Sequence, residues 1–242
     1  MDARAWRGGS RMWGKWITCR VPAAARGRFS AAQAAWSAIG DQPGLVGQLG
    51  GWDGSTGDAL LLGLWSDADA YDRFMRERHD AVADSIGRSA DGDAGYTSID
   101  VATGGVVLEM PGDAADLAHA LERAALLRIA DCRVRPGRSA HFLDVQREVW
   151  APGMAAAGGM LGGVVVRLAP DRHLVASLWI GAEAHQRYTE RQLPGLLARA
   201  VPADDLRAMS GHLLPLEPAW RVRPGSRTGG RPRTGGQQRA NG

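Results

Sequence analysis

His79 is the side chain in this sequence that is best suited to acid–base chemistry. It follows Met75 by four residues and precedes Val82 by three, so on a helix it shares one face with these apolar neighbours. A neutral imidazole in such a setting could accept a proton from a phenol or an enol, or could ligate a haem iron. The alternative is a structural histidine that is bonded to a backbone carbonyl or to the adjacent Asp80.

Large apolar side chains, most of them aromatic, accumulate around His79 in the predicted elements. Some share the helical face of His79, and others come from the preceding helix and strands. The set comprises Trp36, Trp52, Trp65, Phe74 and Met75, with Tyr71 as a second candidate catalytic group. These side chains could wall a flat pocket for a planar ligand. They could equally pack the helices on a sheet, where truncation of a buried tryptophan costs about 3–5 kcal/mol.

Gln33 is a further candidate for substrate binding, because an amide close to the aromatic residues could orient a carbonyl group. An equivalent glutamine, Gln146, occurs later in the chain. Because the residue is present in both places, a structural hydrogen bond is the favoured role. In that later part, His185 and Tyr188 could line a second cavity, although we expect the region to act as scaffold.

Several common motifs are absent from the sequence. There is no phosphate-binding loop with its lysine, no His-x-x-x-His or Cys-x-x-Cys pair and no Gly-x-Ser-x-Gly elbow. A protein-ligated metal site and serine-hydrolase chemistry are therefore not expected. The two cysteines, Cys19 and Cys132, are too few for a disulfide framework and are expected to be small buried residues.

The elements that must position these side chains occur twice. Cys132-Arg133-Val134 repeats Cys19-Arg20-Val21 at an offset of 113 residues, and Phe142 and Gln146 repeat Phe29 and Gln33 at the same offset. In the later part of each copy the offset is 114 residues, as between Trp65 and Trp179, so the position equivalent to His79 holds Leu193. Any chemistry of His79 therefore belongs to the first copy.

Each copy predicts a strand, a helix, two strands, a helix and a strand. In the first copy we expect strands at 13–21, 45–52 and 59–65, helices at 23–39 and 67–86, and a last strand at 96–99 or 106–110. A connecting helix is predicted at 113–121. In the second copy we expect strands at 126–134, 160–168 and 173–179, helices after Pro136 and at 182–200, a short helix at 203–209 and an irregular strand at 212–222.

This order predicts an α+β protein made of tandem ferredoxin-like repeats, β-α-β-β-α-β twice. Each repeat leaves one apolar sheet face uncovered, so the two sheets should pack on each other as an intramolecular dimeric α+β barrel with the helices outside. We expect a flexible extension at 1–11, a ligand-bearing first repeat at 12–110, a connecting helix at 111–124 and a scaffold repeat at 125–222. A monomer then suffices, and a homodimer is compatible with the pattern.

The formal net charge of +3 comes largely from the end of the chain. Residues 223–242 hold arginine, glycine and proline with no acid, and we expect this basic tail to be disordered. A basic tail on a nearly neutral body does not predict specific nucleic-acid binding. No apolar stretch is long enough for a membrane span, and the first residues lack a secretory apolar region, so a cytoplasmic location is expected.

The motifs carry a resemblance to a known superfamily. Pro43-Gly44 before the second strand, Leu64-Trp65 at the end of the third, and the following Ser-Asp-Ala-Asp-Ala-Tyr-Asp-Arg-Phe resemble the dimeric α+β barrel superfamily. The layout is similar to its antibiotic-biosynthesis-monooxygenase group. Gly14-Lys15-Trp16-Ile17-Thr18-Cys19 and His79-Asp80 resemble the uncharacterised YdbC-like proteins.

This resemblance implies a ligand pocket between the helices and the outer face of the sheet. It implies a cofactor-independent monooxygenase, or a related cyclase or isomerase, acting on a small aromatic or polyketide-like molecule, with His79 as the base. A haem-binding or haem-degrading protein is one alternative, although Phe74 stands where the haem-degrading members have a tryptophan. A non-catalytic protein that binds small ligands or is associated with stress is the other, so enzymatic activity is left open.

Overall fold

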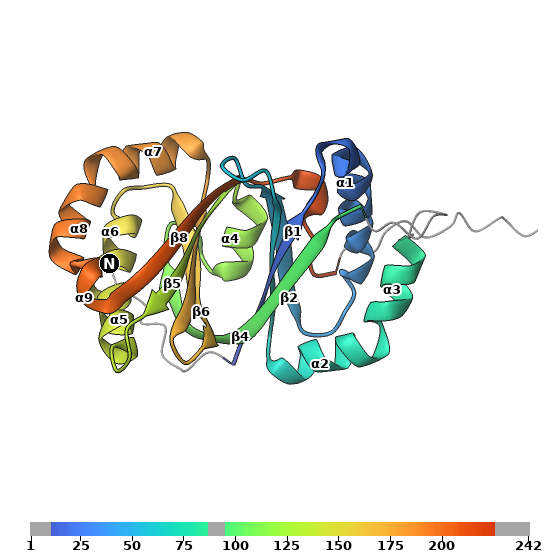
Figure 1. Ribbon diagram of the computed structural model, residues 1–242, viewed down its shortest axis with the longest axis horizontal. Coiled ribbons are helices and arrows are strands. Elements are labelled where there is room, and N and C mark those ends of the chain that lie inside the picture. Colours follow the sequence, from blue (N-terminus) through green and yellow to red (C-terminus); the bar gives the residue numbers. More distant parts are fainter. Residues whose placement is uncertain (1–10, 87–94, 226–242) are drawn as a thin grey trace, which may run out of the picture.

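The computed structural model describes residues 11–86 and 95–225, and these form one curled sheet with most of its helices on the outside (Figure 1). The predicted extension at 1–11 and the tail at 223–242 lie almost wholly outside the described residues. The strands are β1 (Trp13–Arg20), β2 (Leu45–Trp52), β3 (Ala59–Trp65), β4 (Ser98–Pro111), β5 (Leu126–Val134), β6 (Met160–Ala169), β7 (Arg172–Trp179) and β8 (Leu206–Pro215). The helices are α1 (Arg26–Ala35), α2 (Ala68–Glu77), α3 (His79–Ile86), α4 (Leu117–Arg123), α5 (Ser139–Val145), α6 (Ala151–Ala155), α7 (Ala182–Arg191), α8 (Leu193–Ala200) and α9 (Pro202–Asp205).

The sheet is antiparallel throughout, in the order β2-β3-β1-β4-β6-β7-β5-β8. The first four strands belong to the first repeat and the last four to the second, so the α+β prediction of two ferredoxin-like repeats that form one barrel is confirmed. Two segments, 96–99 and 106–110, are predicted as alternatives for the last strand of the first repeat. Residues 106–110 lie within the long strand β4, and residues 96–99 run into its start at Ser98. Its first half pairs with β1 and its second half with β6, so this strand joins the two half-sheets.

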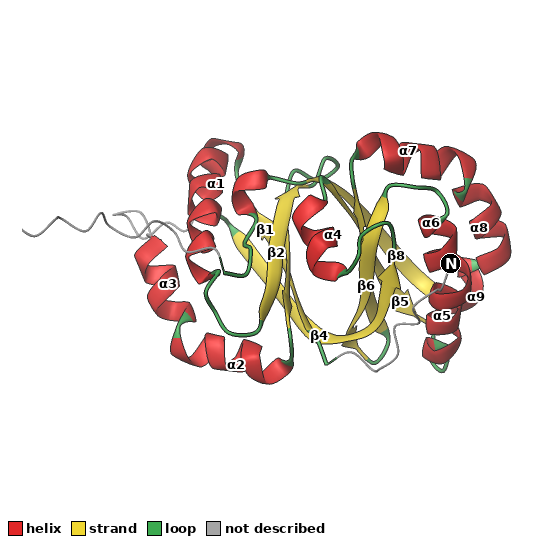
Figure 2. Ribbon diagram, turned by 180° about the vertical axis from the view of Figure 1, so that it is seen from behind, coloured by secondary structure: helices red, strands yellow, loops and turns green. Residues whose placement is uncertain are grey.

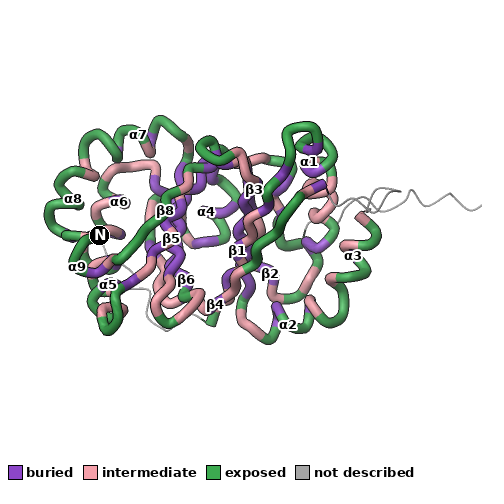
Figure 3. The backbone as a smooth tube through the Cα atoms, viewed as in Figure 1, coloured by how far each residue is buried: buried purple, intermediate pink, exposed green. Residues whose placement is uncertain are grey.

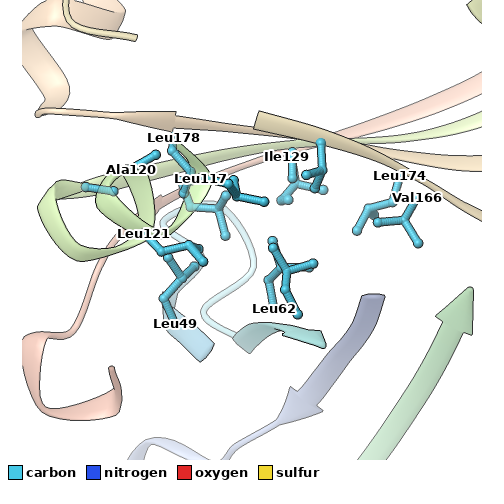
Figure 4. Packing of buried hydrophobic residues seen from close by; sticks show 14 of the residues in the cluster. Leu49, Leu62, Leu117, Ala120, Leu121, Ile129, Val166, Leu174 and Leu178 are labelled. Carbon is cyan, nitrogen blue, oxygen red and sulfur yellow. The ribbon is translucent and has the colours of Figure 1, made fainter. Parts of the chain in front are cut away.

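The two half-sheets enclose a shared apolar interior. Alternation along β1 turns Trp16 into this interior, and the equivalent alternation along β5 turns Leu127 and Ile129 into it. Leucine and valine side chains from both repeats meet there, and α4 closes one end with Leu117, Ala120 and Leu121 (Figure 4). Because neither half-sheet could bury this face alone, the interior is the physical reason why the repeats stay together.

The opposite face of each half-sheet carries helices. Helices α1–α3 lie at one end of the molecule and α5–α9 at the other, with α4 between the half-sheets (Figure 2). The buried positions concentrate in the central strands, while the outer faces of the helices are exposed (Figure 3). Among the described residues, no helix has both the length and the apolar character that crossing a membrane requires.

The helix predicted at 67–86 begins as expected and then breaks. Asp67 is the N-cap, and its side chain accepts a hydrogen bond from the backbone N–H of Ala70 at 2.7 Å. At Arg78 the backbone leaves the helical region, with φ −133°, and α3 begins at His79. The helix predicted at 182–200 breaks at Gln192, which is the equivalent position, so the two repeats share the break.

The end of the chain differs most from the prediction. The short helix expected at 203–209 is present, but its predicted end is wrong, because α9 ends at Asp205 and β8 starts at Leu206, six residues before the predicted strand. After β8 the chain crosses to β2 at the other end of the strand order, where Gln48 and Val222 exchange backbone hydrogen bonds at 3.1 and 2.9 Å. Trp220 is then fully buried against the first repeat. This return segment, 216–222, closes the barrel.

Candidate functional site

The helix-covered face of the first half-sheet holds a cavity of about 640 Å³. Its floor comes from β1 and β3, and its walls come from α1, α2 and α3. All but one of the site residues predicted from the sequence line it: Gln33, Trp36, Trp65, Tyr71, Phe74, Met75 and His79. This volume is within the range of pockets for small molecules.

His79 lies at the start of α3 with its side chain one quarter exposed. Its ring lies 5.6 Å from that of Trp36 and 5.9 Å, edge to face, from that of Phe74. The Nδ1 atom is 2.9 Å from the Oδ1 atom of Asp80. If Nδ1–H donates to this carboxylate, Nε2 is the ring nitrogen with a free lone pair. Because the helix breaks at Arg78, His79 is the first residue of α3.

The aromatic walls are packed on one another. The rings of Trp65 and Phe74 stack with 4.9 Å between centroids, and Tyr71 meets Trp65 edge to face at 6.0 Å. Burial, and then the nearby Asp72, raises the pKa of the Tyr71 phenol. Tyr71 therefore stays protonated at neutral pH and can donate a hydrogen bond.

Trp52 is the predicted site residue that the structure places elsewhere. Its ring lies 5.1 Å from Trp220 and 5.8 Å from Phe29, and the guanidinium of Arg26 covers it at 4.8 Å. It packs on the return segment and does not line the cavity. The sequence placed it with the others because it could not show that the end of the chain comes back to this strand.

Lys15 is the cavity residue that the sequence reasoning missed. It lies on the same face of β1 as Ile17 and Cys19, with Nζ 5.7 Å from the centre of the Tyr71 ring. Burial lowers the pKa of this ammonium group. Two signals could have identified it: strand alternation places it opposite the interior residue Trp16, and it is the one lysine among the chain's 29 lysine and arginine residues.

The charges around the cavity are unevenly distributed. Asp80 and Asp84 line its outer part near His79, while Lys15 lies on its floor against Tyr71. Cys19 is a free, buried thiol whose pKa burial raises to about 12, so it is not a nucleophile at neutral pH. Within the described residues, no group of three His, Cys, Asp or Glu side chains is arranged to hold a metal ion.

The second repeat builds a cavity at the equivalent place, on the helix-covered face of the second half-sheet. His185 and Tyr188 both line it, and Gln146 takes the position of Gln33. The prediction that these two side chains could face a second cavity therefore corresponds to the geometry.

The fold is similar to those of several solved structures. A crystal structure of an anthrone oxidase-like protein has a TM-score of 0.61 at 12% identity, over 89% of this chain and 94% of that one. A proposed monooxygenase from Lactobacillus acidophilus NCFM has a TM-score of 0.65 at 13% identity, over 89% and 97%. Chlorite dismutase from Candidatus Nitrospira defluvii, in complex with imidazole, has a TM-score of 0.55 at 9% identity, over 87% and 92%. This protein has a monooxygenase-like α+β barrel fold.

The family model that matches the sequence covers most of the first repeat. Residues 14–103 match the family described as a domain of unknown function, DUF4937. The uncharacterized protein YdbC of Bacillus subtilis (strain 168) is 34% identical over 71 residues, which are 28% of this chain and 60% of that protein. The chain thus spans 60% of the length of this curated relative, and the resemblance to YdbC-like proteins is confirmed.

Proposed function

We propose that the cavity of the first repeat binds a small aromatic or polyketide-like molecule with an ionisable hydroxyl or enol, and that it deprotonates this molecule for reaction with oxygen. The observation that carries the proposal is the meeting of Lys15, Tyr71 and His79 in one aromatic-walled cavity. The likeness of the fold to an anthrone oxidase-like protein supports the same class of substrate. A related cyclisation or isomerisation would begin with the same proton transfer.

His79 is the proposed base. Its Nδ1–H bond to Asp80 leaves Nε2 as the proton acceptor, and Trp36 and Phe74 hold the ring from two sides. The first repeat has this imidazole, whereas the second has Leu193 at the equivalent position. A base of this kind removes a proton from a carbon or oxygen acid without any cofactor.

Lys15 and Tyr71 are proposed to stabilise the anion that results. The ammonium of Lys15 supplies a positive charge on the cavity floor, and the phenol of Tyr71 supplies a hydrogen-bond donor. Both act in a partly dehydrated site, where such interactions are stronger than in water. The aromatic walls exclude water from the reactive anion.

The overall reaction balances with O₂ as the co-substrate and oxidant, and it needs no cofactor. For an anthrone-type methylene, the deprotonated substrate gives electrons to O₂, one oxygen atom replaces the two methylene hydrogens as a carbonyl, and the other leaves as water. The protein contributes the proton transfer, the positioning and the shielding of the anion.

The haem alternative fits the residues less well. A haem would bring two propionate groups into a cavity whose described lining offers one cation, Lys15, and two carboxylates, Asp80 and Asp84. A Soret absorption band in the purified protein would contradict this view and favour the haem-binding alternative.

The proposal is tested by oxygen consumption with anthrone as substrate. We expect His79→Leu, which installs the residue of the second repeat, to lower kcat/KM by about 10²-fold or more. His119→Ala is the matched control, because this exposed histidine of α4 bonds to Asp116 outside the cavity and should leave the rate unchanged. Full activity of the His79→Leu variant would show that His79 is not the base. Ligand binding without any turnover in the unaltered protein would favour a non-catalytic role.

Lys15 gives an independent readout because its side chain is the one lysine amine in the chain. After reductive ¹³C-methylation, NMR titration should report a lysine pKa below 10.5 in the free protein. A bound phenolate analogue such as 1,8-dihydroxyanthraquinone should raise it, because an adjacent anion favours the ammonium. A lysine pKa that does not respond to this analogue would refute the proposed role of Lys15.

A further inference from the structure

The second-repeat cavity encloses about 430 Å³ and is built from equivalent positions. Cys132, Phe142 and Gln146 line it where Cys19, Phe29 and Gln33 line the first. It also retains a cation at the same place, because Arg128 occupies the position on β5 that Lys15 occupies on β1. The position equivalent to His79 holds Leu193, but a cation is present on the floor of both cavities.

Arg128 has no acidic partner among the described residues. Its Nη1 donates to the backbone carbonyl of Ile129, and no carboxylate of the described residues lies within ion-pair distance. Burial lowers the pKa of this guanidinium. The glycine at 211 on β8 leaves it room, since a Cβ atom there would lie 3.2 Å from Nη2. A partly buried cation without a counterion is costly, and an anionic ligand would remove that cost.

Three titratable side chains that line the cavity with Arg128 are uncharged at neutral pH, namely Cys132, His185 and Tyr188. Burial, and then the charge of Arg128, lowers the pKa of His185 to about 4, and burial raises the pKa of Tyr188 and of Cys132 to about 12. The buried Asp205 also lines the cavity, but it accepts hydrogen bonds from Arg138 Nε and His141 Nδ1, each at 2.9 Å. Arg128 is therefore the uncompensated charge of the described lining.

The rest of the lining suits an apolar body. Trp150, Met154 and Leu193 are among the apolar side chains that enclose the cavity. At its rim, Leu197 of α8 and Met209 of β8 are 45% and 55% exposed although both are large and apolar. Apolar side chains left in contact with water beside a cavity are typical of a binding site for an apolar ligand.

We propose that the second-repeat cavity is a binding site for a small amphiphilic carboxylate, with the carboxylate on Arg128 and an aryl or medium-chain body among the apolar side chains. The planar fork of a guanidinium matches the two oxygens of a carboxylate. His185 and Tyr188 can add neutral hydrogen bonds. This site uses none of the residues of the first cavity and stands or falls independently of the reaction proposed there.

The test uses 1-naphthoate and its neutral isostere 1-naphthamide on the full chain. Binding is followed by the NMR signals of the tryptophan indoles, because Trp150 lines the second cavity and Trp36 the first. The variants Trp150→Phe and Trp36→Phe assign the two signals. We expect naphthoate to shift the Trp150 signal and to bind at least about tenfold more tightly there than naphthamide.

Arg128→Gln should weaken naphthoate at the Trp150 signal by at least about tenfold and leave naphthamide unaffected. Lys15→Gln is the matched control, since it removes the equivalent cation of the other cavity and should not change this binding. An unshifted Trp150 signal, equal affinity of the two probes, or unchanged naphthoate binding in Arg128→Gln overturns the proposal. If Arg128→Gln does not fold, the comparison of the two probes on the unaltered chain still decides.

Discussion

Lys15 and Arg128 occupy equivalent strand positions, and each places a cation on the floor of a cavity. Both lie one residue from an interior side chain, Trp16 and Leu127, and therefore point to the helix-covered face. Strand alternation and the offset of 113 residues already relate them in the sequence. Their importance appeared only when the structure showed a cavity beside each, because a cation on a strand is otherwise most often a solvated surface residue.

His173 on β7 is a residue whose environment is unfavourable for any charge. It is fully buried next to Phe142, and neither ring nitrogen has a hydrogen-bond partner in the described structure. Burial, and then the nearby Arg167, lowers its pKa from 6.5 to about 4. The unfolded chain therefore binds a proton at a higher pH than the folded chain does.

We predict that this histidine makes the protein acid-sensitive. Above about pH 6.5 this histidine is neutral in both the folded and the unfolded chain, so the free energy of unfolding does not depend on its titration. As the pH drops from about 6.5 to about 4, the free energy of unfolding falls by on the order of 3 kcal/mol. His173→Leu should reduce this slope and raise stability at pH 7, because two unpaired polar atoms are removed from the interior. Urea unfolding at a series of pH values measures both effects, and His119→Ala serves as the exposed-histidine control. An unchanged slope in His173→Leu would contradict the prediction.

At the scale of elements, β4 decides the architecture. Residues 96–110 read as two competing short strands in the sequence because glycines at 104 and 105 interrupt the apolar pattern. In the structure those glycines are the point where the strand passes from β1 to β6. A Cβ atom at Gly104 would lie 1.9 Å from the carbonyl oxygen of Arg167. The two half-sheets therefore approach each other so closely at this point that there is no room for a side chain.

We therefore predict that Gly104→Ala destabilises the protein and Gly105→Ala does not. Overpacking typically costs about 1–3 kcal/mol, and contact with a rigid backbone oxygen places Gly104→Ala at the upper end of that range. At Gly105 the nearest atom to an added Cβ is Trp13 Cζ3 at 3.9 Å, which is ordinary contact. Denaturant midpoints of the two variants provide the measurement, and equal stabilities would show that the junction can relax.

The helices illustrate a second limit of sequence patterns. The apolar periodicity from Tyr71 to Ile86 continues through Arg78, so it predicts one helix, yet the chain breaks there and again at the equivalent Gln192. The sequence identified the face of His79 correctly, but its neighbours Trp36 and Phe74 were fixed by the packing of three helices.

At the scale of the whole molecule, the shared interior couples the repeats. Leu62 of the first repeat and Leu174 of the second are both essentially inaccessible in the same cluster. The return segment adds a second link, because it carries Trp220 from the end of the chain into the first repeat.

We predict that the described body unfolds in one transition. Leu62→Ala and Leu174→Ala should each lower the stability of the whole by about 2–5 kcal/mol, because both leave a cavity in the same interior. Far-UV circular dichroism and tryptophan fluorescence should report coincident denaturation curves for both variants. Leu213→Ala, at a 40% exposed position, is the control with a small expected effect. Two separate transitions, each moved by one variant, would mean that the repeats fold independently.

The sequence by itself determined the duplication, the order of strands and helices along each repeat, the start of the helix at 67 and most of the side chains around the first cavity. These follow from periodicity and local turn chemistry, which act over a few residues. Only the tertiary structure decided that β4 is one strand joining both sheets, that the end of the chain returns to β2 and takes Trp52 out of the site, and that a cation lies on the floor of each cavity. Those features arise from contacts between segments far apart in the chain, where close packing selects among arrangements that the local sequence permits equally.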